Sequence, residues 1–65
     1  MSRTTKETAY AIGYTLLDRG LSVDDAEEMA TGIAELLYPE DKTWCGKFKE
    51  LVMEAWGGRV YHERL

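Results

Sequence analysis

Residues 22–38, SVDDAEEMATGIAELLY, decide the fold of this chain. The stretch begins with Ser22, a residue type that caps a helix by accepting a backbone hydrogen bond in its first turn. Two aspartates follow, where carboxylates are stabilised by the positive end of the helix dipole. The stretch stops before Pro39, which cannot continue a helix. Together these features predict a helix over residues 23–38.

The predicted helix has an apolar side and an acidic side. Its apolar residues share an arc of about 160° at 100° per residue, and we expect this arc to be the core against which the other helices pack. The arc comprises Val23, Ala26, Met29, Ala30, Ile33, Ala34, Leu36 and Leu37. The three alanines form a ridge that would allow another helix to approach closely, and Gly13 is a suitable partner for that contact. The opposite side carries Asp24, Glu27, Glu28 and Glu35.

Two other stretches have helical periodicity. Residues 4–19 place apolar residues over an arc of about 200°, wider than the roughly 100° stripe of an ordinary surface helix. Gly20 is placed to end this helix in the left-handed conformation that glycine adopts easily. Residues 43–56 form the third predicted helix, with Asp41 or Thr43 as its cap and a Gly-Gly pair after it.

These three segments predict an all-α fold, a small three-helix bundle in one domain covering residues 1–65. The tail, residues 57–65, interleaves apolar and charged residues. It is compatible with a short fourth helical turn, a strand-like arm or a frayed end.

Few stabilising devices are open to a chain of 65 residues. Cys45 is the only cysteine and His62 the only histidine, so an intrachain disulfide and a typical structural zinc site are both excluded. Below about 70–80 residues, self-association often supplements a small core. We expect no signal peptide and no membrane span. With a free cysteine, the expected location is the cytoplasm of the producing cell or of a host cell.

No residue pattern indicates catalysis, a cofactor or a metal. A nucleophilic Cys45 would need a nearby base and a lowered pKa, whereas its place beside an apolar face favours an inert structural thiol. Adjacent carboxylates on one helix cannot face each other across a substrate, as glycosidase acids do. We therefore expect a protein that is not an enzyme.

Protein binding is the function that the composition favours. The chain has seven aromatic residues, and these cannot all be central in so small a bundle; tyrosine and tryptophan are frequent in interfaces. The candidate apolar contacts are Tyr10, Tyr14, Leu17, Trp44 and Trp56. Because the first helix has the excess apolar arc, we expect a homodimer formed through it.

A second candidate surface is acidic. No Lys or Arg occurs between Arg19 and Lys42, and the net charge of the chain is −4. Asp24, Glu27, Glu28 and Glu35 could therefore meet a basic partner, although most acidic helix faces are simply solvated. In size and charge the chain is similar to small acidic inhibitors encoded by phages. That similarity implies an accessory or inhibitory factor, and no motif adds to it.

The alternative is a helix-turn-helix-like DNA-binding regulator that uses residues 43–56. The chain contains no Asn and no Gln, the usual readers of adenine, and it is acidic overall. Nucleic acid is therefore the less favoured partner. A contiguous positive strip beside the third helix would favour it.

Overall fold

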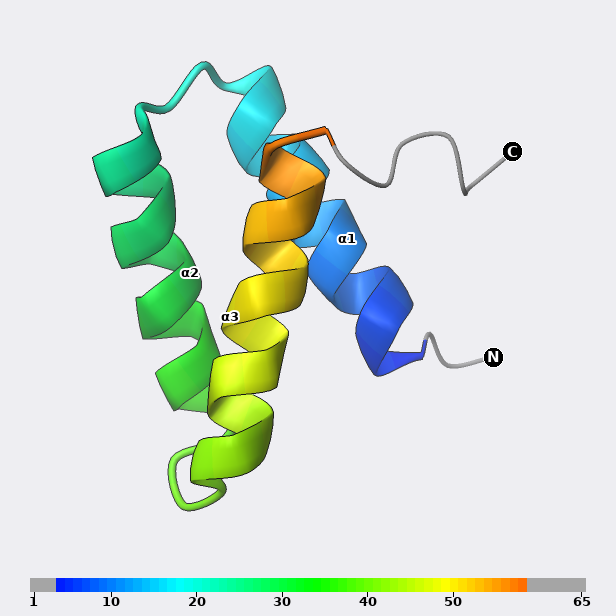
Figure 1. Cartoon of the computed structure of the whole chain (residues 1–65), viewed down its shortest axis with the longest axis vertical. Coiled ribbons are helices and arrows are strands. Elements are labelled where there is room, and N and C mark those ends of the chain that lie inside the picture. The colour runs from blue at the N-terminus through cyan, green and yellow to red at the C-terminus, as the bar shows by residue number, and fades with distance from the viewer. Residues whose placement is uncertain (1–3, 59–65) are drawn as a thin grey trace.

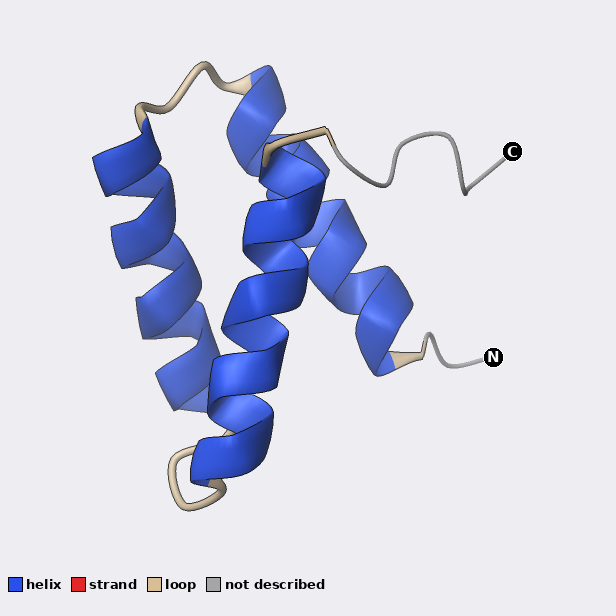
Figure 2. Cartoon of the chain, in the orientation of Figure 1, coloured by secondary structure: helices blue, strands red, loops and turns tan. Residues whose placement is uncertain are grey.

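The computed structural model describes residues 4–58, and all regular structure in this range is helical (Figure 2). The helices are α1 (Thr5–Asp18), α2 (Val23–Leu37) and α3 (Lys42–Trp56). The prediction of a small all-α three-helix bundle is confirmed. In the tail, Gly57 and Gly58 form a turn, and residues 59–65 lie outside the described residues, so the three conformations considered for the tail stay predictions.

Each helix begins at a side chain that caps it. Ser22 Oγ accepts a hydrogen bond from the backbone N–H of Asp25 at 3.2 Å, as its position before α2 predicts. Of the two caps considered for α3, Asp41 is the one used, and its Oδ1 accepts from Trp44 N–H at 3.1 Å. α1 is capped by a reciprocal capping box between Thr4 and Glu7, which was not among the predicted caps.

The ends of α1 and α2 follow from single residues. Gly20 has a φ of 73°, and the N–H groups of Gly20 and Leu21 donate to the carbonyls of Leu17 and Leu16. These two bonds form a Schellman motif, which confirms the role predicted for Gly20. α2 ends at Leu37, before Pro39, and Tyr38 has left the helical region with a φ of −131°.

α3 is the central helix of the bundle (Figure 1). α1 and α2 both pack against α3 but barely contact each other, and the molecule is only 17 Å thick along its shortest axis. The expectation that α2 supplies a core for both other helices is therefore wrong. Alanines are the commonest residues of the core within residues 4–58. Its members are Ala9, Leu16, Ala26, Ala30, Ala34, Phe48, Val52 and Ala55.

α1 approaches the backbone of α3 closely at Gly13. A methyl group added at this glycine would collide with the carbonyl oxygen of Val52 and lie 2.6 Å from Cβ of Ala55. Gly13 therefore packs against α3, and the predicted contact between Gly13 and the alanine ridge of α2 is wrong. The ridge itself is buried, and it belongs to the face of α2 that packs on α3.

The apolar side of α2 is also less buried than its periodicity predicts. The alanine ridge is inaccessible to solvent and Ile33 is half-buried, but Val23, Met29, Leu36 and Leu37 are exposed. The reason is geometric, because a single neighbour, α3, covers only the middle of an arc of about 160°. The larger side chains at the edges of the arc consequently remain in contact with solvent.

Candidate functional site

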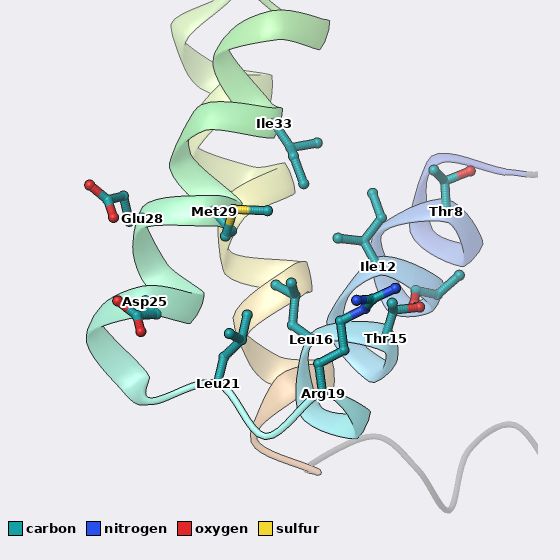
Figure 3. Close-up of a pocket in the computed structure, with 11 residues that line it drawn as sticks. Thr8, Ile12, Thr15, Leu16, Arg19, Leu21, Asp25, Glu28, Met29 and Ile33 are labelled. Atoms are coloured by element: carbon teal, nitrogen blue, oxygen red, sulfur yellow. The ribbon is translucent and has the colours of Figure 1, made fainter.

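An apolar groove lies between α1 and α2, where the two helices diverge on either side of α3 (Figure 3). Its volume is about 750 Å³. The residues that line it are Thr8, Ala11, Ile12, Thr15, Leu16 and Arg19 from α1 and its end, Leu21 from the loop, and Asp25, Glu28, Met29 and Ile33 from α2. We call this feature the α1/α2 groove.

The apolar walls of the groove follow from how each helix packs on α3. Gly13 turns one side of α1 to α3, so that Ile12, one position away, extends toward α2 (Figure 3). On α2 the alanine ridge faces α3, and Met29 and Ile33 extend toward α1. Met29 remains 48% exposed, so the walls do not close on each other.

The apolar row on α2 continues past the groove lining. Leu36 lies three residues after Ile33 and seven after Met29, a spacing that keeps the three on one side of a helix. Its side chain is 83% exposed, the largest value among the exposed large apolar residues within residues 4–58. Exposed apolar residues beside an apolar groove are typical of a binding site.

The charged residues of the groove are divided between its two sides. Asp25 and Glu28 lie on α2, and Glu28 points away from α1 (Figure 3), whereas Arg19 lies at the end of α1. Within residues 4–58 the one ion pair joins Lys49 to Glu27, and it involves none of the charged residues that line the groove.

The predicted acidic face lies beside the groove and is continuous with it. Asp24, Glu27, Glu28 and Glu35 are all exposed and border one shallow surface hollow on α2. Asp25 and Glu28 line both this hollow and the α1/α2 groove. The face is not entirely free of cations, because Lys49 of α3 reaches Glu27 with an N–O distance of 3.6 Å. That pair is exposed, and such pairs contribute at most about 1 kcal/mol.

The aromatic and apolar candidates are distributed over three places. Tyr10 and Tyr14 are half-buried neighbours on α1 with ring centroids 6.5 Å apart, and Leu17, on the same side, is 47% exposed. By helical spacing this side of α1 is separated from Ile12 by Gly13. None of the three residues lines the α1/α2 groove.

Trp44 and Trp56 lie near opposite ends of α3, about 18 Å apart along the helix axis. Trp44 stacks on Tyr38 at 6.2 Å between ring centroids, and Lys47 Nζ lies 5.8 Å from the Trp44 ring. Trp56 is half-buried and packs against the core. The two tryptophans therefore do not belong to one patch.

The Cys45–His62 pair considered for catalysis is only partly described by the structure. Cys45 is half-buried and packs against the core, and His62 lies outside the described residues. In the same range no group of His, Cys, Asp and Glu side chains has the arrangement of a metal site. No helix described is both long and apolar enough to cross a membrane.

The sequence predicts that Met29 and Ile33 belong to the core, and it places Ile12 and Leu16 in the wide apolar arc of residues 4–19. Ile12, Leu16, Met29 and Ile33 have the spacing of core residues, and periodicity alone does not distinguish a covered apolar edge from an uncovered one. The available signal was the pair of wide apolar arcs on two helices in a chain with only one further helix to cover them.

Comparison of the chain with protein-family models, curated proteins and solved structures finds no match in any of the three.

Proposed function

We propose that this chain is a non-enzymatic protein–protein interaction module that acts as a small accessory or inhibitory factor. The observation that carries the proposal is the α1/α2 groove, an open apolar surface on a domain whose own core is small. Burying Met29 and Leu36 under a partner would remove apolar area from water, at about 25 cal/mol per Å². The free Cys45 supports a reducing compartment, and we propose the cytoplasm as its location.

Capture of partners from native cell extract tests this proposal. The wild-type chain is compared with Met29→Gln, which replaces an apolar side chain in the groove by a polar one of similar size. Leu37→Gln is the matched control, because Leu37 is also exposed but does not line the groove. We expect Met29→Gln to lose proteins that the wild type and the control both retain. Identical recovery by all three chains would contradict a binding role for the groove.

Self-association through α1 is a second, separable part of the proposal. Tyr10, Tyr14 and Leu17 form the side of α1 that lies beyond the groove, and Leu17 is exposed. We expect sedimentation to give a dimeric mass at high micromolar concentration and Leu17→Lys to give a monomer. Met29→Gln should remain dimeric, since it alters the other side of the molecule. A monomeric mass for the wild type at every concentration would contradict the dimer.

Duplex DNA binding by α3 has less support. The exposed side of α3 carries Glu50 as well as Lys47, and Lys49 is paired with Glu27. Glu50 and the Lys49–Glu27 pair place negative charge among the lysines of α3, which weighs against the contiguous positive strip that would favour DNA. An acidic surface on the neighbouring helix would also repel phosphates.

A further inference from the structure

The α1/α2 groove has the form of an unoccupied position in a helical bundle. α1, α3 and α2 supply three helices around it, and the two outer ones barely touch. Ile12 and Leu16 on one wall, and Met29 and Ile33 on the other, are each four residues apart. Rows at this spacing are the ridges between which the side chains of another helix pack. A fourth helix would complete a four-helix arrangement.

The charge beside the groove selects the kind of helix. Asp25 and Glu28 belong both to the groove and to the acidic hollow on α2, so apolar and acidic surfaces adjoin along one edge. A ligand that covers this edge must be apolar on one side and basic on the neighbouring side. Among residues 4–58, Arg19 is the one cation that lines the groove, and it lies on the opposite wall.

We propose that the α1/α2 groove binds a basic amphipathic helix of a partner protein, with apolar residues at i, i+4 and i+7 in the groove and Lys or Arg toward Asp25 and Glu28. This inference rests on the proposed function and specifies its partner class.

None of the three helices within residues 4–58 would give a second copy of the chain the chemistry of this ligand. Every charged residue of α2 is acidic, so a second α2 would bring carboxylates next to Asp25 and Glu28. α3 packs against α1 and α2 through its apolar side, and its exposed side carries Glu50 as well as Lys47. α1 carries Lys6 together with Glu7 and Asp18, and is not basic. Like charges across an interface disfavour it, whereas opposite charges accelerate and orient association.

Two synthetic helical peptides of about 15 residues, a length of about 22 Å, provide the test. Both carry leucines at i, i+4, i+7 and i+11; one has lysines beside the leucine stripe and the other has glutamates at the same positions. Binding to the full chain is measured by fluorescence anisotropy at low and at physiological salt. We expect the lysine peptide to bind at least about tenfold more tightly than the glutamate peptide, and salt to reduce the difference.

Glu28→Lys is the decisive variant. It lies beyond the first turn of α2 and is exposed, so it reverses the charge without removing a cap or a core contact. We expect it to weaken the lysine peptide about tenfold and to strengthen the glutamate peptide. Glu40→Lys is the matched control, with the same charge change in the loop before α3, away from the groove. Thermal unfolding by circular dichroism verifies that both variants are folded.

Each other outcome overturns the inference in a recognisable way. Equal binding of both peptides, or equal effects of Glu28→Lys and Glu40→Lys, would show that the acidic edge does not select the ligand. Preference for the glutamate peptide would contradict the basic partner while leaving a helix-binding groove. No binding of either peptide at about 1 mM, with capture from extract still dependent on Met29, would exclude a helical ligand and leave the proposed function standing. If neither peptide binds and capture from extract does not depend on Met29, the proposed function and the proposed helical ligand are both contradicted.

Discussion

Replacing Gly13 with alanine is expected to lower the free energy of unfolding by about 2–3 kcal/mol, although alanine is the better helix former. The added methyl group would overlap the backbone carbonyl of Val52 and lie 2.9 Å from the backbone nitrogen of Trp56. Backbone atoms of a packed helix cannot move aside as a flexible side chain can. α1 must therefore shift away from α3, and the contacts of Ala9 and Leu16 with the core would be weakened.

Gly32→Ala is the control for this prediction. Gly32 is an exposed helical residue of α2, and a methyl group there would meet no atom within 4 Å. Helix propensity then acts alone, and we expect a gain of about 0.5–1 kcal/mol. Urea unfolding followed by circular dichroism measures both variants. An unchanged or raised stability for Gly13→Ala would mean that α1 and α3 do not approach as closely as the structure places them.

Phe48→Ala is expected to have the largest effect of any single substitution in the core. Phe48 is 1% exposed, and with Val52 it is one of two large side chains that are fully buried within residues 4–58. Its ring also contacts Tyr38, with centroids 5.7 Å apart. Truncating a buried phenylalanine costs about 3–5 kcal/mol, comparable with the roughly 3–5 kcal/mol that a core of this size supplies. The variant should be largely unfolded at room temperature.

Trp44→Ala is the control for Phe48→Ala, because it removes an aromatic side chain that is less buried. Trp44 lies on the same helix and also contacts Tyr38, but it is 40% exposed. We expect a loss of less than about 1.5 kcal/mol, because less area is removed from water. Far-UV circular dichroism reports the folded fraction without depending on the tryptophan itself. A Phe48→Ala chain that retained full helicity and a cooperative transition near that of the wild type would contradict the packing described.

The small core gives a physical reason for a partner. Five of the eight apolar residues that are buried within residues 4–58 are alanines, whose burial contributes little because each side chain is a single methyl group. Larger side chains such as Met29 and Leu36 remain exposed instead. A ligand that binds only the folded chain would raise its stability by about 2.7 kcal/mol at one hundred times its dissociation constant.

The sequence alone determined the helices and most of their ends. Ser22, Gly20 and Pro39 act through the backbone groups of the adjacent turn, so their effects do not depend on the rest of the fold. The all-α class follows from the same local information together with apolar periodicity. Even the missed cap at Thr4 was readable in principle, since the Glu7 that completes its capping box lies three residues later.

Only the tertiary structure decided which helix is central and which apolar edges stay open. Periodicity assigned Met29 and Ala30 to the same side of α2, yet the alanine is inaccessible and the methionine lines a groove. The difference arises because Gly13 and the alanine ridge bring α1 and α2 close to α3 rather than to each other. That choice depends on how surfaces from distant parts of the chain fit together. As a result of this packing, residues whose spacing is typical of a core line the candidate binding site instead.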